Sequence, residues 1–172
     1  VKSLLPAQLH IGVGHDCIKL YKNLITASYV SKEMYRLGEE ARDKELLFMG
    51  EMGLDPGIDH MSAMRHINEL KEKGAKITAF RSYTGGLVAP ESIGNNPWRY
   101  KFTWNPRNVV LAGQGTAQYL HQGKFQYIPY NRLFKEYDIV EIGQMGEFEV
   151  YANRDSLLYR ETYGRQDVPN IW

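Results

Sequence analysis

The sequence predicts an α/β protein in two parts, the later half of a doubly wound parallel sheet and then a part with a mixed or antiparallel sheet. In the first third of the chain, short apolar runs alternate with amphipathic segments at roughly 22 to 25 residues, the length of a βα unit. From Lys76 onward the apolar side chains recur at every second position, the period of a strand. We place the domain boundary at residue 56, which gives domains 1–56 and 57–172.

The elements of the first part follow from this periodicity. Apolar side chains at helical spacing predict helices over 8–20 and 58–73, and a third helix that begins at the N-cap Ser31 and includes Ala41. Apolar runs predict strands over 1–5, 24–27 and 46–49. The last run is continuous, which is typical of a strand covered on both faces.

The second part is predicted to consist mainly of strands, with few helices. Alternation predicts a strand over 76–83, and aromatic residues predict an extended segment over 100–104. Pro106 suits the first position of a short helix over 107–112. Strands over 117–121 and 124–128 flank Gln122-Gly123 as a hairpin. Two further strands, over 139–142 and 148–151, are predicted to be joined across 143–146.

Composition excludes several classes of protein. The 172 residues are 43% hydrophobic and 24% charged with a net charge of +1, so no nucleic-acid or membrane partner is expected. The single cysteine, Cys17, excludes an intrachain disulfide and favours a reducing compartment, and we expect a cytoplasmic protein. The chain lacks an initiator Met and starts and stops within predicted elements, so we expect a piece of a longer polypeptide.

One loop, EMGLDPGIDH at 51–60, lies between the part with the βα pattern and the part with the strand pattern. Strand ends also fall near Leu5 and near Ser28, and we expect these three loops to meet at one edge of the sheet, where ligands gather in open α/β sheets. Gly53 and Gly57 would let backbone approach a ligand. The competing interpretation is a tight turn in which Asp59 is an ordinary helix cap.

Familiar chemical motifs are missing. The GVGHDC run at 12–17 lacks a third glycine and falls inside a predicted helix, so it is not a dinucleotide fingerprint. Neither a P-loop nor a G-x-S-x-G elbow occurs. The histidines have no metal-ligand spacing, and solvated or capping carboxylates are favoured over a metal cluster of His60 with Glu51, Asp55 and Asp59. We therefore predict no metal site.

Arg154 has two interpretations. It ends a predicted strand between Asn153 and Asp155, and its planar fork could hold a carboxylate bidentately. An ordinary surface ion pair is the alternative.

Taken together, seven segments resemble the saccharopine dehydrogenase family of the glutamate-forming type, over nearly the whole chain. In order they are SLLP at 3–6 with His10 following, TASYVS at 26–31, EMGLDPGIDH at 51–60, YTGGL at 83–87, NP at 96–97, YKFTW at 100–104 and YANRDS at 151–156. The G-L-D-P-G-I-D-H and N-R-D-S motifs carry most of the specificity.

The resemblance implies an NADP(H)-dependent oxidoreductase, with NAD(H) as an alternative, that joins glutamate to aminoadipate semialdehyde through an imine or runs the reverse oxidation. It implies that 1–56 is the later part of a Rossmann-type cofactor domain and that 57–172 binds substrate and forms a homodimer. The implied cofactor contacts are Leu4, Leu5, Gly53, Leu54, Asp55 and Thr103, the last standing where the family usually has Ser. The implied substrate contacts are Ala27, Ser28, Asp55 and Arg154, with Asp55 also the candidate acid or base.

Two departures bear on substrate and cofactor preference. Ala7 stands where fungal members have Tyr, and Thr84 where they have Cys. The alternatives are a carboxynorspermidine dehydrogenase-like imine reductase, which would place acids where Arg154 stands, and a non-catalytic substrate or dimerisation module. Because the chain contains no pyrophosphate loop, we expect these 172 residues to be inactive alone.

Overall fold

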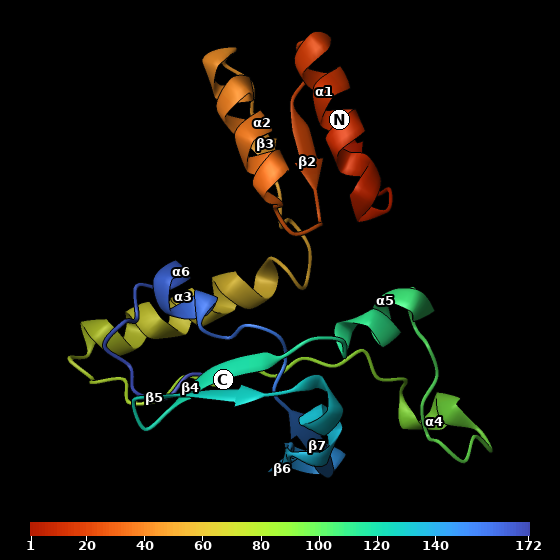
Figure 1. Ribbon diagram of the computed structural model, residues 1–172, viewed down its shortest axis with the longest axis vertical. Helices are drawn as coiled ribbons and strands as arrows, with labels where there is room; N and C mark the ends of the chain where they lie inside the picture. The colour runs from red at the N-terminus through yellow and green to blue at the C-terminus, as the bar shows by residue number, and fades with distance from the viewer. The chain divides into compact units, whose positions relative to one another are not determined.

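The computed structural model describes residues 1–172 apart from the side chain of Ala112. The chain divides into two compact units, Val1–Ala75 and Lys76–Trp172, and each is described by itself. Figure 1 labels their helices and strands. Helix α3 (Ile58–Glu72) falls within the residue range of the first unit, and the functional boundary at residue 56 stays a prediction. Within the described residues, no helix combines the length and the apolar character needed to cross a membrane.

The first unit contains the predicted parallel sheet. Its strands β1 (Lys2–Ser3), β2 (Leu24–Thr26) and β3 (Phe48–Met49) lie in the order β1-β2-β3, with Lys2 opposite Ile25 and Leu24 opposite Phe48. Every strand is shorter than predicted because the chain leaves the ladder early to form the connecting loops. The parallel arrangement itself is confirmed.

Two helices connect these strands and bury the core. Helix α1 (His10–Lys19) follows the 3₁₀ turn η1 (Ala7–Leu9), and α2 (Lys32–Asp43) begins after Ser31, whose hydroxyl accepts the Met34 N–H at 3.1 Å. The predicted N-cap is therefore confirmed. Their buried side chains form two adjoining clusters with β2: Cys17, Leu24 and Met34, and Ile18, Leu37 and Ala41.

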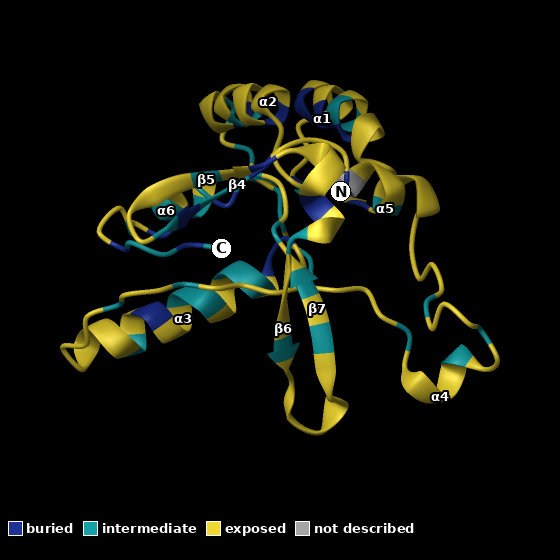
Figure 2. Ribbon diagram, turned by 60° about the horizontal axis from the view of Figure 1, so that its bottom comes forward, coloured by how far each residue is buried: buried dark blue, intermediate teal, exposed yellow. Residues whose placement is uncertain are grey.

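Both helices lie side by side on one face of the sheet (Figure 2). With strand order β1-β2-β3, each right-handed crossover steps in the same direction and places its helix on the same face. Leu47 and Met49 are 51% and 37% exposed. Within this unit the third strand is therefore covered on one face, and the expected cover on its second face stays a prediction.

The second unit contains the predicted hairpins. Strands β4 (Ala117–His121) and β5 (Lys124–Ile128) pair antiparallel around Gln122-Gly123, and β6 (Tyr137–Glu141) pairs with β7 (Glu147–Tyr151). Single bridges add a parallel pairing of Gln118 with Asp155 and an antiparallel pairing of Leu120 with Ile171. A mixed arrangement is therefore confirmed.

Short helices complete the second unit: α4 (Pro90–Ile93), α5 (Pro106–Ala112), α6 (Leu158–Thr162) and the 3₁₀ turns η2 (Tyr130–Lys135) and η3 (Gly143–Met145). Helix α5 begins at Pro106 as predicted, and the Asn105 side chain accepts the Asn108 N–H at 3.3 Å. The core has two clusters, Ala117 with Ile128 and Leu133, and Leu120 with Val168 and Ile171.

The predicted strand over 76–83 is not formed, and the segment 100–104, expected to be strand-like or extended, joins no strand. The segment 76–83 makes a single bridge, from Phe80 to Ile171, because the partner segment is only the short stretch 170–172. The segment 100–104 pairs with no strand, and the Asn96 side-chain amide donates a hydrogen bond to the Tyr100 carbonyl at 2.6 Å. Alternation alone does not supply a neighbouring strand, so these segments stay irregular.

Candidate functional site at the carboxyl edge of the parallel sheet

The three loops after β1, β2 and β3 meet at one edge of the sheet, as predicted. The Glu51 N–H donates to the Ser28 carbonyl at 3.0 Å, and the Met52 N–H donates to the Thr26 carbonyl at 3.1 Å. The loop after β1 is tied in through Ser3, whose hydroxyl lies 3.0 Å from the Nδ1 atom of His10. Parallel pairing is what brings these strand ends to one place.

The loop between β3 and α3 is a tight turn. The Gly53 N–H donates to the Pro56 carbonyl at 3.0 Å, and the Ile58 N–H donates to the Gly53 carbonyl at 2.9 Å. Gly57 has φ +148°, and a Cβ there would collide with the Gly53 carbonyl. Asp59 accepts the Gly57 N–H at 2.6 Å. The glycines therefore serve backbone-to-backbone contact, and the tight turn of the competing interpretation is present. The N-cap of α3 is Gly57, and Asp59, in the first turn of the helix, binds the backbone N–H of that residue.

Asp55 is fixed at this edge by a hydrogen bond. The Tyr29 hydroxyl donates to the Asp55 Oδ1 atom at 2.7 Å, which links the loop after β2 to the loop after β3. Asp55 itself is exposed. A carboxylate held in one orientation by a phenol, with its second oxygen available, can accept a proton or an ammonium group.

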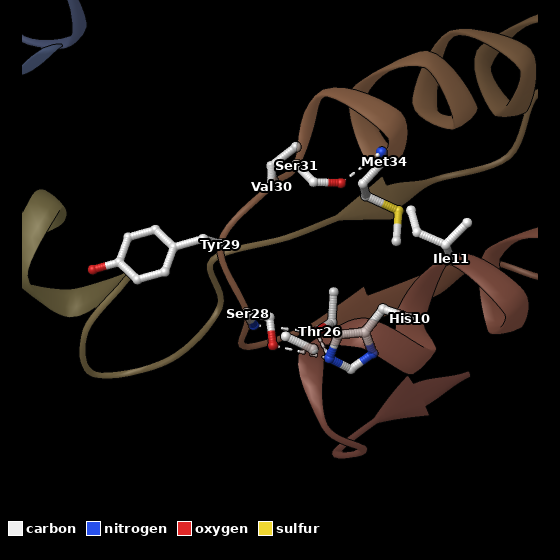
Figure 3. Close-up of a pocket in the computed structure, with 9 residues that line it drawn as sticks. His10, Ile11, Thr26, Ser28, Tyr29, Val30, Ser31 and Met34 are labelled. Atoms are coloured by element: carbon white, nitrogen blue, oxygen red, sulfur yellow. Dashed lines mark hydrogen bonds between the residues drawn. The ribbon is translucent and has the colours of Figure 1, made fainter. Parts of the chain in front are cut away.

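A buried polar cluster lies beneath the edge (Figure 3). The imidazole of His10 contacts the hydroxyls of Thr26 and Ser28 at 3.0 and 2.9 Å, as Figure 3 shows, and its other nitrogen lies 3.0 Å from the Ser3 hydroxyl. Ser3, His10 and Thr26 are buried, whereas Ser28 is half-buried and lines a small pocket of about 80 Å³ that Ala7 also lines. Ser28 thus connects the buried imidazole to the surface.

Exposed leucines surround these polar groups. Leu4 and Leu5, on the loop after β1, are 90% and 48% exposed, and Leu54, on the loop after β3, is 75% exposed. Ala27 faces Gly53 so closely that a Cβ on Gly53 would lie 3.2 Å from the Ala27 Cβ. Apolar surface beside a few convergent polar groups is the usual composition of a small-molecule site.

Thr103 and Arg154 belong to the second unit. The exposed Thr103 hydroxyl donates to the Gly86 carbonyl at 3.4 Å, a weak contact between the segments 83–87 and 100–104. Arg154 follows β7 with φ +48°, and its carbonyl accepts the Gln118 N–H at 2.7 Å. Within the described part of this unit, the exposed guanidinium forms no ion pair, so the surface-pair interpretation is not supported.

The acids near His60 do not assemble a metal site. His60 Nε2 lies 3.8 Å from a Glu51 oxygen and 4.0 Å from an Asp59 oxygen. Among the described residues, no group of three or more His, Cys, Asp or Glu side chains has the arrangement that a metal ion needs.

Sequence reasoning did not single out four residues that the structure brings together at this edge: Ser3, His10, Thr26 and Tyr29. A signal was present, because Ser3 and Thr26 are polar residues at the ends of neighbouring apolar strands. Parallel strand ends converge, so two inward hydroxyls require a shared polar partner. His10, at the start of the intervening helix, is that partner.

The fold and this edge are those of a parallel α/β protein with polar groups gathered at the carboxyl ends of its strands. The model of the saccharopine dehydrogenase C-terminal domain matches residues 53–171. The chain belongs to this saccharopine dehydrogenase family.

Individual relatives extend the match to the first unit. The alpha-aminoadipic semialdehyde synthase of Arabidopsis thaliana is 45% identical over 95% of this chain. The saccharopine dehydrogenase [NADP(+), L-glutamate-forming] of Pyricularia oryzae is 40% identical over 99%. The solved apo saccharopine dehydrogenase (L-Glu forming) from Saccharomyces cerevisiae is 36% identical, with a TM-score of 0.90 over 99% of the chain. The chain spans 16%, 38% and 38% of these three proteins.

Proposed function

We propose that this chain is part of an NADP-dependent, glutamate-forming saccharopine dehydrogenase, an oxidoreductase that acts on a CH–NH bond. The named activity of the fungal relatives supports the proposal. The observation that carries it is the carboxyl edge itself, where Ser28 and the oriented Asp55 lie among exposed leucines. Residues 1–56 would be the later part of a Rossmann-type cofactor domain, and 57–172 the substrate and dimerisation domain.

The residues present fit a nicotinamide cofactor. Leu4, Leu5 and Leu54 offer an uncovered apolar surface at the edge where α/β sheets bind ligands, and the backbone at Gly53 adds groups without a side chain. We assign these residues, with Asp55 and Thr103, to cofactor binding. NADP(H) is proposed from the names of the relatives, with NAD(H) the alternative. When bound, the nicotinamide supplies or accepts the hydride.

The substrate assignment follows from charge. Saccharopine carries three carboxylates and a secondary amine, so its site needs a cationic fork and an acceptor near nitrogen. We assign Arg154 to a carboxylate, Ala27 and Ser28 to contacts along the substrate, and Asp55 to the nitrogen and its proton. Asp55 is suited to this because the Tyr29 hydroxyl fixes one of its oxygens.

The test is turnover by the complete protein that contains this sequence. Saccharopine is added with NADP⁺ or NAD⁺ in turn, and the absorbance of the reduced cofactor is followed. We expect saccharopine-dependent reduction, and a fall in kcat/KM of about 10- to 100-fold in Arg154→Ala, the loss of a charge-assisted contact. Arg132→Ala is the matched control, because that exposed side chain pairs with Glu136 at 2.6 Å.

Other outcomes redirect the proposal. Activity with a carboxylated polyamine in place of saccharopine would move the protein to the carboxynorspermidine type of reaction. No turnover with either substrate would favour a non-catalytic module. We further propose a cytoplasmic homodimer whose partners are small molecules, not nucleic acid or membrane. Its support is the near-neutral charge, the single buried cysteine and exposed aromatics such as Tyr127 and Tyr151.

A further inference from the structure

We infer that His10 is a positioning residue that sets the orientation of the Ser28 hydroxyl and turns its oxygen toward the substrate nitrogen. This inference rests on the proposed function, because it takes Ser28 to contact the substrate. His10 is 4% exposed, and although it borders the same small pocket as Ser28, it leaves almost no surface for a ligand to contact. It acts through Ser28, the half-buried member of the cluster.

The contacts fix the imidazole on both sides. Ser3 lies 3.0 Å from Nδ1, while Thr26 and Ser28 lie 3.0 and 2.9 Å from Nε2. Ser3 and Thr26 come from neighbouring strands, so the ring is held by the sheet and Ser28 is the partner on the loop. The hydrogen-bond partners of the ring nitrogens are all hydroxyls.

We take His10 to be the Nδ1–H tautomer. The Thr26 hydroxyl oxygen accepts the Ser28 N–H at 3.1 Å, and His10 Nε2 is an acceptor within reach of the Thr26 proton. In this tautomer Nδ1–H donates to Ser3, and the Thr26 and Ser28 hydroxyls share the single lone pair of Nε2 in a three-centre hydrogen bond, with Ser28 at 2.9 Å.

The orientation of the Ser28 hydroxyl decides which ligand groups it can bind. With its proton directed at His10, the hydroxyl presents lone pairs to the site. Ser28 then accepts from a cationic or N–H-bearing nitrogen and does not donate to a carboxylate. That role complements Arg154, which is suited to the carboxylate, and it places the secondary amine on the same edge as Asp55.

The test compares His10→Gln with His10→Asn in the complete protein. A Gln side chain can reach the position of Nε2, whereas Asn reaches only that of Nδ1. We expect His10→Asn to raise the KM for saccharopine about tenfold, which corresponds to the loss of one hydrogen bond. We expect the KM of His10→Gln to stay within about threefold of that of the unsubstituted protein. The KM for the nicotinamide cofactor and the inhibition constant of glutarate, a dicarboxylate without nitrogen, stay unchanged.

A double-mutant cycle with Ser28→Ala separates positioning from a structural role. We expect Ser28→Ala to raise the same KM about tenfold, and the added His10→Asn change to have no further effect. Additive effects, or equal changes in the glutarate inhibition constant, would overturn the inference while leaving the proposed function in place. Thermal unfolding checks each variant, and Ser3→Ala takes the place of His10→Asn in the cycle if that variant does not fold. Absence of saccharopine turnover in the unsubstituted protein overturns both.

Discussion

The two units differ in how their strands are buried. In the first unit, β2 lies between its neighbours beneath two helices, and Leu24 is 1% exposed. In the second unit, the β6–β7 hairpin keeps much of its apolar surface open (Figure 2), with Ile139 at 53% and Tyr151 at 50%. The comparison teaches that strand pairing alone does not make a core, and that a covering layer decides what each strand contributes to stability.

The largest effect is expected from Leu24→Ala, which removes a fully buried side chain. It should lower the free energy of unfolding by about 2–5 kcal/mol, whereas Ile139→Ala should cost about 1 kcal/mol or less. Hydrogen exchange of peptides that cover β2 and β6 in the complete protein reads each unit separately. Equal losses would break the comparison, because they would mean that another part of the protein covers the β6–β7 face.

A second contrast concerns two glycines with positive φ. Gly57 has φ +148° and backbone where a Cβ would stand, while Gly123 has φ +75° and open space. Gly57→Ala should therefore lower the free energy of unfolding by about 3 kcal/mol, and Gly123→Ala by about 1 kcal/mol. Thermal unfolding of both variants gives the comparison. A milder effect at Gly57 would show that the turn between β3 and α3 can relax.

The first unit was the more predictable from sequence. Its parallel sheet, the N-cap Ser31 and the meeting of three loops follow from local periodicity and from the geometry of βα units, which need no distant information. The buried cluster around His10 was missed because hydroxyls on separate strands become neighbours only once the register is known.

In the second unit, pairing between neighbouring strands was predictable, whereas pairing between distant segments was not. Both hairpins were predicted, since turn residues such as Gln122-Gly123 specify them locally. The segment 76–83 was predicted as a strand but found only a single bridge, from Phe80 to Ile171, at the far end of the chain. Arg154 could be singled out by its residue type and flanking strand. Only the structure shows that Arg154 forms no ion pair within the described part of the unit.

A smaller effect is expected from Tyr29→Phe, which removes the hydroxyl that fixes Asp55 at 2.7 Å. One hydrogen bond contributes about 1 kcal/mol, so kcat for saccharopine oxidation should fall about fivefold. Tyr127→Phe in the second unit is the matched control, because that side chain is 59% exposed. An unchanged kcat in Tyr29→Phe would show that Asp55 needs no orientation, and would weaken its assignment as the acid or base.

The smallest effects should come from surface ion pairs, which exist in both units with the same i,i+4 spacing. In the first unit the Arg65 guanidinium donates to Glu69 at 2.8 Å and holds the pKa of that carboxyl below its ordinary value of 4.5. Because the folded-state pKa is depressed, the stabilisation is present above pH 4.5 and is lost as pH falls through the folded-state pKa. Solvent screens this pair, because the Arg65 side chain is exposed and that of Glu69 is partly exposed. Glu69→Gln should therefore lower the melting temperature by about 1 °C or less at pH 7 and have no effect at pH 2. Glu136→Gln, which breaks the Arg132 pair of the second unit, should behave alike at pH 7. Matching small shifts would locate the difference between the units in their buried residues, whereas a large shift in one unit alone would show that surface charge also separates them.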